Sequence, residues 1–388
     1  MKKRTGILLL MIAGITLSIN AQEVNYNKAL ADAEPHVLQL INETLVAKDD
    51  KLSFPRTESN DSLKLVASND WTSGFWPGLL WKMYESSGNE IFMSNAVAYT
   101  KLMEREEWNA DSHDVGFKMY SSFGNGYKIT GKDEYKNIIV QAAKTLSVRF
   151  NSKVGCIRSW NNTAWAYPVI IDNMMNLELL FEATKLSGDS SFYRIAISHA
   201  NTTLKNQYRK DYSCYHVVDY DTATGKVIKK NTAQAYADES AWARGQAWGL
   251  YGFTMCYRET KNITYLRQAE AIANFILKNP NLPADLIPYW DYNVPGKETA
   301  PRDVSAAAIT ASALYELSSY SKEASWYRTS ADKILSSIIK NYRAPLNTHH
   351  GFILLHSTGH KPANSEVDVP IIYADYYYIE ALLRRKKM

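Results

Sequence analysis

Two aspartates, Asp114 and Asp172, each stand at the start of a long apolar segment. Asp114 lies in SHDVGFKMY and Asp172 in PVIIDNMMN. If these segments are helices of one bundle, both carboxyl groups project toward the same end of it. Two carboxyl groups in one pocket can act as a general acid and a general base. Each residue could instead be a simple helix N-cap, because aspartate is favoured at that position.

The residues around Asp172 bear on its protonation. Isoleucines precede it and methionines follow in IIDNMM, and apolar surroundings raise the pKa of a carboxyl group by disfavouring its charged form. A negative charge on Asp114 would act in the same direction, whereas a helix N-terminus acts in the opposite one. One carboxyl group of the pair can therefore hold a proton near neutral pH, although the sequence leaves the balance between these effects open.

A second cluster lies in the segment ESAWARGQAWGLYG, which contains Trp242, Arg244 and Trp248. The Arg244 guanidinium could meet a substrate carboxylate or a developing negative charge. It could also form a structural salt bridge with a buried aspartate. Of the two tryptophans, we expect one to be a platform for a sugar ring and the other to belong to the core.

Further candidates lie in loops. His216 and Gln234 flank a predicted tight hairpin whose turn contains Gly225. The histidine is either a hydrogen-bonded structural residue or a ligand for a hydroxyl or carboxylate group. Trp71 and Trp76 in NDWTSGFWPG offer stacking faces, although a tryptophan at the start of a buried helix commonly belongs to the core.

Other function classes find little support in the sequence. It has no Walker loop, dinucleotide fingerprint, HExxH motif or GxSxG elbow, and the pair His349–His350 has no third ligand nearby in sequence. A net charge of +4 without a basic stripe argues against a nucleic-acid surface. We therefore expect an acid/base enzyme without cofactor or metal. The widely spaced Cys156, Cys214 and Cys256 match no metal pattern and favour buried free thiols.

The elements that must position these residues alternate along the chain. Apolar residues fall on all sides of six segments, as in buried helices; these segments start near Gly74, Asp114, Asp172, Arg244, Ser305 and Pro370. Amphipathic segments lie between them, at Ile91–Glu106, Glu134–Phe150, Phe192–Tyr208, Tyr265–Leu277 and Trp326–Tyr342. With His36–Val46 as the sixth outer helix, the pattern predicts an all-α, closed (α/α)6 barrel of six helical hairpins. A linear α-solenoid is the alternative.

The N-terminal residues 1–21 combine a basic start, an apolar stretch and a small residue at Ala21, as in a secretory signal peptide. A retained N-terminal anchor is the alternative. Residues 22–388 contain no linker-like stretch, and we expect one catalytic domain. The mature chain is expected to have no membrane span, to be exported to the periplasm or secreted, and to need no obligate protein partner.

Five ordered motifs resemble the unsaturated glucuronyl hydrolases of glycoside hydrolase family 88: WTSGFWPGLLW, HDVGFKMYSSF, IIDNMMNLELLF, WARGQAWGLYG and DVSAAAITASALYEL. The resemblance implies an (α/α)6 barrel and an unsaturated oligosaccharide substrate, of the glycosaminoglycan type that polysaccharide lyases produce. It also implies an unusual reaction, in which the enzyme hydrates the C4=C5 vinyl ether of the terminal 4,5-unsaturated uronic acid. The resulting hemiketal rearranges and releases the rest of the oligosaccharide.

The resemblance also implies roles for individual residues. Asp172 matches the general acid and base, and Asp114 matches a second essential aspartate that contacts sugar hydroxyls. Positions that match substrate contacts are His216, Gln234, Trp242, Arg244 and Trp248, with Trp71 and Trp76 in the platform region. Some members that favour sulfated sugars carry serines and a lysine in the stretch LLHSTGHKPANSE, where this chain offers Ser357 and Lys361.

Three alternatives remain. An unsaturated rhamnogalacturonyl hydrolase would use the same barrel on pectin fragments, but WARGQAWG fits the glucuronyl family better. An N-acylglucosamine epimerase would depend on histidine pairs, which the aspartate-led motifs argue against. A non-catalytic glycan-binding protein would use the tryptophans alone and would have no need for Asp172 in apolar surroundings.

Overall fold

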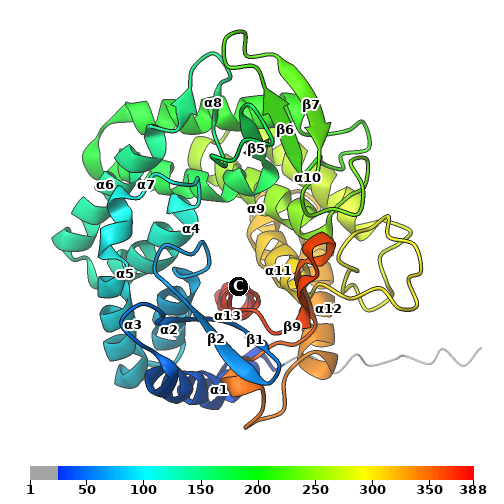
Figure 1. Cartoon of the computed structure of the whole chain (residues 1–388). Helices are drawn as coiled ribbons and strands as arrows, with labels where there is room; N and C mark the ends of the chain where they lie inside the picture. Colours follow the sequence, from blue (N-terminus) through cyan, green and yellow to red (C-terminus); the bar gives the residue numbers. More distant parts are fainter. Residues whose placement is uncertain (1–24) are drawn as a thin grey trace, which may run out of the picture.

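A computed structural model describes residues 25–388, so the predicted signal peptide lies outside the described residues. Long helices form an inner and an outer ring (Figure 1). The inner ring consists of α2 (Phe75–Ser87), α4 (Val115–Met119) with α5 (Asn125–Thr130), α7 (Leu177–Ser187), α9 (Ala243–Thr260), α11 (Val304–Ser318) and α13 (Ile372–Lys386). The outer ring consists of α1 (Tyr26–Ala47), α3 (Glu90–Leu102), α6 (Asp133–Ser147), α8 (Ser190–Asn206), α10 (Ile263–Leu277) and α12 (Ala324–Asn341).

The ring is closed by its last inner helix, since α13 packs against α2 as well as against α11. The N-terminal α1 also contacts α13 (Figure 1). The fold is therefore the predicted (α/α)6 barrel, and the linear solenoid is excluded. The inner helices α9, α11 and α13 are buried on nearly every side, which explains why their sequences lack a polar stripe.

Local sequence signals set the turns of the hairpins. Gly88, Gly131 and Gly188 end inner helices in the left-handed conformation, which glycine adopts without strain. Asn89 and Asp189 then cap the following outer helices through their side chains. These three inner helices are thus each joined to the following outer helix by a short turn.

Three helices differ from the sequence prediction. Helix α1 begins at Tyr26, well before His36, and runs through Pro35. The second inner segment is interrupted by a π-helical turn at η2 (Tyr120–Gly124), and the third begins as the 3-10 helix η3 (Ile171–Asn176). The apolar pattern continues through both interruptions, so periodicity alone did not reveal them.

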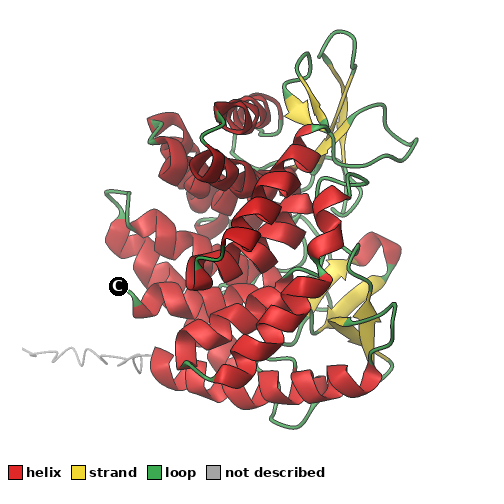
Figure 2. Ribbon diagram, turned by 90° about the vertical axis from the view of Figure 1, so that its left-hand side faces the viewer, coloured by secondary structure: helices red, strands yellow, loops and turns green. Residues whose placement is uncertain are grey.

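Small sheets gather on one side of the helical barrel (Figure 2). The antiparallel pairs are β1 (Phe54–Ser59) with β2 (Ser62–Val66), β3 (Phe150–Asn151) with β4 (Cys156–Ile157), and β8 (Ser357–His360) with β9 (Ser365–Val369). A three-stranded sheet has the order β5 (Pro168–Ile170), β6 (Val217–Tyr220), β7 (Val227–Asn231). The β6–β7 hairpin confirms the predicted turn, in which Gly225 has a φ of 70°.

Short 3-10 helices complete the chain at η1 (Glu104–Trp108), η4 (His349–Gly351) and η5 (Lys361–Ala363). The three cysteine thiols are buried and unpaired, as expected. Within residues 25–388, no helix combines the length and apolar character that crossing a membrane requires.

Candidate active site

A pocket of about 90 Å³ lies where several inner helices begin, and we call it the inner pocket. Its lining comprises Trp71, His113, Asp114, Phe117, Trp160, Ile170, Asp172, Gln234 and Arg244. The structure thus brings together both predicted catalytic aspartates and three of the predicted substrate-binding residues. These side chains come from segments more than a hundred residues apart in sequence.

Pairing of β5 with β6 determines where Asp172 lies. Ile170 is opposite Val217 in the sheet, and the Ile171 N–H donates to the His216 carbonyl at 3.1 Å. The next residue, Asp172, therefore turns into the pocket beside His216, with 3.7 Å between its Oδ2 atom and His216 Nε2. A strand before the third inner helix thus gives the carboxyl group a fixed neighbour.

The carboxyl group of Asp172 is suited to hold a proton. Burial raises its pKa to about 7, and the negative charge of Asp114 contributes in the same direction. The positive charge of Arg244, a backbone N–H and the Trp248 indole N–H favour the carboxylate, but they do not outweigh burial. Its Oδ2 atom has no hydrogen-bond partner among the described residues. Asp172 is therefore a buried acid at the wall of the inner pocket.

His216 is held as a neutral donor. Its Nδ1 accepts the backbone N–H groups of Ala233 at 3.0 Å and Gln234 at 3.2 Å, so the proton resides on Nε2. Burial lowers the pKa of the ring to about 3, and the charge of Arg244 lowers it further. The buried Nε2 atom has no hydrogen-bond partner within residues 25–388. Its N–H lies beside the Asp172 carboxyl group, although His216 itself does not line the inner pocket.

Asp114 is oriented by a chain of hydrogen bonds. The Asn176 side chain accepts the Phe117 N–H at 2.8 Å, which directs its amide nitrogen toward His113 Nδ1 at 3.3 Å. His113 Nε2 then carries the proton and lies 3.3 Å from Asp114 Oδ1. The other carboxylate oxygen accepts the Ser112 hydroxyl at 2.9 Å. Asp114 makes no side-chain N-cap bond, so its carboxylate is available to the pocket.

Gly116 permits this arrangement, because a Cβ atom there would lie 2.4 Å from Asn176 Cα. We expect Gly116→Ala to push α4 away from η3 and to break the bond from Phe117 to Asn176. Overpacking of this kind costs about 1–3 kcal/mol. Denaturant titration should show that loss, and kcat should fall because Asp114 loses its support. Gly88→Ala is a control without steric conflict, since no atom lies within 4 Å of its added Cβ, although its positive φ carries some strain.

Arg244 is buried, and its guanidinium makes hydrogen bonds to other groups of the protein. It donates to Asp303 Oδ2 at 2.8 Å and to the carbonyls of Thr358 and Gly359 in β8. The structural salt bridge considered from the sequence is therefore present, but its partner is Asp303 rather than Asp114 or Asp172. Arg244 also lines the inner pocket, so structural and binding roles coexist.

Three tryptophans expected at the substrate lie in the core instead. Trp76 is completely buried and packs edge-on against Tyr99. Trp242 is 3% exposed and is sandwiched between His216 and Arg244, which it supports. Trp248 is also completely buried, beneath the Asp172 carboxyl group whose pKa it influences. Stacking on Trp76, Trp242 or Trp248 is excluded by burial.

Four residues of the inner pocket were not predicted from the sequence: His113, Phe117, Trp160 and Ile170. His113 and Phe117 stand in the same motif as Asp114, and Ile170 precedes the catalytic segment, so adjacency was a usable signal. Trp160 lies in an irregular loop that no motif marks, and only folding brings it edge-on to His216. With Trp71, it gives the pocket two aromatic walls.

A second pocket of about 340 Å³, the outer pocket, adjoins the first and shares Trp71, Trp160 and Gln234 with it. The β8–β9 hairpin forms its other side. Ser357 is completely buried, and neither Ser357 nor Lys361 lines either pocket. Both therefore lie outside the site for which the sequence suggested them.

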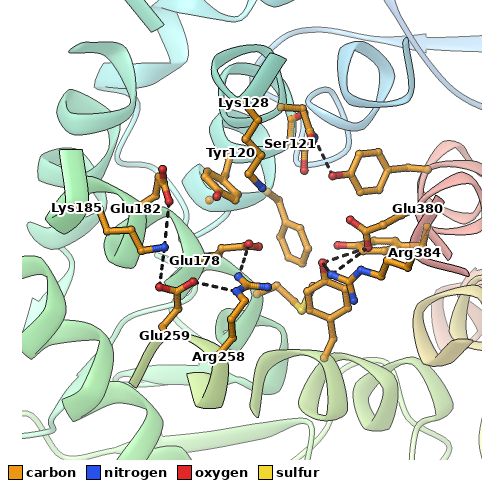
Figure 3. Close-up of a pocket in the computed structure, with 17 residues that line it drawn as sticks. Tyr120, Ser121, Lys128, Glu178, Glu182, Lys185, Arg258, Glu259, Glu380 and Arg384 are labelled. Atoms are coloured by element: carbon orange, nitrogen blue, oxygen red, sulfur yellow. Dashed lines mark hydrogen bonds and ion pairs between the residues drawn. The ribbon is translucent and has the colours of Figure 1, made fainter. Parts of the chain in front are cut away.

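A third space of about 290 Å³, the rear cavity, lies between the inner helices α4, α5, α7, α9 and α13. Its acidic and basic side chains face one another (Figure 3). Arg258 pairs with Glu178 at 2.5 Å and with Glu259 at 2.9 Å, and Lys185 pairs with Glu259 at 2.8 Å. These ion pairs join α7 to α9 across the cavity. Across residues 25–388, no cluster of three or more acidic, histidine or cysteine side chains is placed to hold a metal ion.

Comparisons with known proteins agree with this geometry. Residues 45–382 match the model of Glycosyl Hydrolase Family 88. An unsaturated glucuronyl hydrolase of Formosa agariphila is 48% identical over 373 residues, covering 95% of this chain and 92% of the relative. An unsaturated chondroitin disaccharide hydrolase of Streptococcus pneumoniae is 34% identical and covers 86% of each chain.

Among solved structures, the crystal structure of an unsaturated glucuronyl hydrolase specific for heparin superposes with a TM-score of 0.89 at 44% identity. It covers 94% of this chain and 98% of its own. The family match spans both aspartate motifs and the inner helices from α2 to most of α13. The chain therefore belongs to glycoside hydrolase family 88, and the expected class of enzyme, an unsaturated glucuronyl hydrolase, is confirmed.

Proposed function

We propose that this enzyme removes the 4,5-unsaturated uronic acid from the non-reducing end of lyase-generated glycosaminoglycan fragments. Protonated Asp172 delivers its proton to C4 of the vinyl ether, and water adds at C5. The Asp172 carboxylate then takes up a proton from that water, so that the acid is regenerated. The C5 hemiketal opens, and the bond to the remaining sugar breaks with loss of the leaving group as an alcohol.

The observation that carries the proposal is a buried acid that lines the inner pocket, has a pKa of about 7 and has one oxygen without a hydrogen-bond partner among the described residues. A vinyl ether reacts with acid, and a general acid is most effective when its pKa is near the working pH. The His216 N–H, 3.7 Å from that oxygen, can hold the water or a ring hydroxyl. A protein that only binds glycans gains nothing from a buried, unpartnered carboxyl group, which carries a desolvation cost.

Asp114 has a different role in this proposal. Its orientation by His113 and Ser112 makes it a fixed acceptor, suited to bind sugar hydroxyl groups rather than to donate a proton. Trp71 and Trp160 supply aromatic walls for the ring. Together, these residues fix the ring so that C4 can face Asp172.

The outer pocket suits a leaving sugar without a sulfate group. Its cation Arg56 is already engaged, because both Glu366 oxygens accept from it at 2.5 and 2.7 Å, and Asp70 accepts at 2.7 Å. A sulfate group would have to displace a carboxylate from this bidentate pair. We therefore propose that the preferred substrate is a fragment whose leaving sugar carries no sulfate group. Export to the periplasm or medium, where such fragments arise, is also part of this proposal.

The deciding experiment follows the loss of ultraviolet absorbance by the conjugated enol-carboxylate. Purified enzyme is offered unsaturated chondroitin, hyaluronan, heparin and pectin disaccharides, with the chondroitin and heparin members offered both with and without sulfate. We expect decay on glycosaminoglycan members, fastest on unsulfated ones. Decay on the pectin fragment alone would favour an unsaturated rhamnogalacturonyl hydrolase, and binding without decay on any member would favour a glycan-binding protein.

The pH profile offers a separate test. Because Asp172 must be protonated to donate, activity should be present below its pKa and should fall as pH rises through about 7. A plot of kcat/KM against pH, which reports the free enzyme, should show this basic limb. A profile that stays flat from pH 6 to 9 would contradict the assignment.

A further inference from the structure

Arg244 lies close to the proposed proton donor, but its guanidinium is engaged by an ion pair and hydrogen bonds with other groups of the protein. Asp303 Oδ2 accepts from it at 2.8 Å, and this ion pair is 1% exposed on the arginine side and completely buried on the other. The Thr358 carbonyl accepts from the same nitrogen at 2.6 Å, and the Gly359 carbonyl accepts from the other one. The guanidinium is therefore fixed between α11 and the β8 strand.

Asp303 is itself held from several sides. Its other carboxylate oxygen accepts the Ser305 hydroxyl at 2.5 Å and caps α11 through the Ala306 N–H at 3.4 Å. The Thr358 N–H lies 3.5 Å from the same oxygen. Asp303 stands at the start of the motif DVSAAAITASALYEL, for which the reaction itself supplies no role. It thus connects an inner helix, Arg244 and the hairpin that forms the outer pocket.

The alternative partner for Arg244 is Asp172, which lines the same pocket. The groups that influence the Asp172 carboxyl group are Arg244 from α9, Asp114 from the start of α4, the Trp248 N–H and a backbone N–H, with neutral His216 opposite. Tyr373 of α13 lies over the Arg244 guanidinium at 5.4 Å. Among these groups, only Arg244 carries a positive charge. A direct ion pair between the two would turn the proton donor into a carboxylate.

We propose that Asp303 is a positioning residue that holds the Arg244 guanidinium against β8 and so prevents this cation from pairing with the Asp172 carboxyl group. The inference rests on the proposed function, in which Asp172 must carry a proton. Asp303 touches neither pocket and acts entirely through Arg244. The same contact joins Arg244 to the wall of the outer pocket, because Arg244 and Gln234 both donate to the Gly359 carbonyl.

The test compares pH profiles of kcat/KM for wild type, Asp303→Asn and Arg244→Gln. Asparagine can still cap α11, but it no longer neutralises Arg244. We expect the basic limb of Asp303→Asn to move down by about one pH unit or more, so that the ratio of kcat/KM at pH 8 to kcat/KM at pH 5 is about tenfold or more lower than in wild type. In Arg244→Gln, the basic limb of the residual activity should lie at higher pH than in wild type. A purely structural defect would not move the two limbs in opposite directions.

Asp375→Asn is the matched control. Asp375 is also completely buried at the start of an inner helix, where it accepts the N–H groups of Ile353 and Leu354 at 2.9 Å, and no salt bridge joins it to any described residue. For Asp375→Asn, we expect a loss of stability, but the basic limb of kcat/KM should stay at the same pH as in wild type. An unmoved limb in folded Asp303→Asn, or a downward shift in Arg244→Gln, would overturn the inference. If Asp303→Asn does not fold, Arg244→Gln decides alone.

The two proposals fail in different ways. Turnover by an Asp172→Asn variant would refute the proposal that Asp172 is the proton donor. An inactive Asp172→Asn together with an unmoved limb in Asp303→Asn would leave the reaction standing and refute only the role of Asp303.

Discussion

Asp172→Asn is expected to lower kcat by about a hundred- to ten-thousand-fold, which corresponds to about 3–5 kcal/mol of transition-state stabilisation. Asparagine keeps the size of the side chain but has no acidic proton to give to C4. The pocket already tolerates a neutral group there, since burial raises the pKa of Asp172 to about 7. Substrate binding should therefore persist while turnover is lost, and the absorbance assay with a binding titration would measure both.

Asp219→Asn is a useful control for this substitution. Asp219 lies nearby in β6 and is 2% exposed, but its carboxylate accepts the backbone N–H groups of Ala166 and Tyr167 and lines neither the inner nor the outer pocket. We expect it to affect stability more than kcat. Turnover by Asp172→Asn within tenfold of wild type would refute the assignment of the proton donor.

The barrel could be predicted from the sequence because inner and outer helices differ in their pattern of apolar and polar residues. Segments such as α9 and α11 are apolar on all sides, whereas α6 and α8 are amphipathic, and each pattern follows from the burial that the fold imposes. Position in the chain also indicated closure, because an unmatched outer helix at one end met an unmatched inner helix at the other.

The site was less accessible to sequence reasoning, for two physical reasons. Tryptophan is suited equally to a core and to a sugar platform, so only the fold could separate Trp71, which lines the pocket, from Trp76, which packs in the core. Contacts distant in sequence were also invisible. The partner of Arg244 proved to be Asp303, 59 residues away, and Trp160 reaches the pocket from a loop without any motif.

Glu380→Gln should produce the largest loss of stability, because this carboxylate joins four inner helices at the rear cavity (Figure 3). Glu380 of α13 accepts from Lys82 of α2 at 3.0 Å, from Ser312 of α11 at 2.6 Å and from Tyr251 of α9 at 3.1 Å. Its pair with Lys82 joins the last inner helix to the first. The substitution leaves a buried ammonium group without its counterion, which costs about 3–5 kcal/mol.

Denaturant unfolding at pH 7 would measure this loss. Burial alone would raise the pKa of Glu380, but the charges of Lys82 and Arg384 hold it well below its usual range. For a depressed carboxyl pKa, the stabilisation is fully present above the unfolded-state value of about 4.3 and is lost as pH falls toward the folded-state value. The difference between wild type and Glu380→Gln should therefore be constant above about pH 5 and shrink in more acidic solution.

Glu85→Gln is the matched control, since Glu85 of α2 pairs with Lys387 at the end of α13 at 2.6 Å. That pair joins the same two helices, but its side chains are 34% and 68% exposed, and a surface ion pair contributes about 0–1 kcal/mol. Equal losses of stability in the two variants would show that the ion pair at the rear cavity contributes no more to closure of the barrel than the surface pair does. A larger loss in Glu380→Gln, partly recovered when Lys82 is also replaced by methionine, would show that the barrel depends on one buried charge pair between its first and last inner helices.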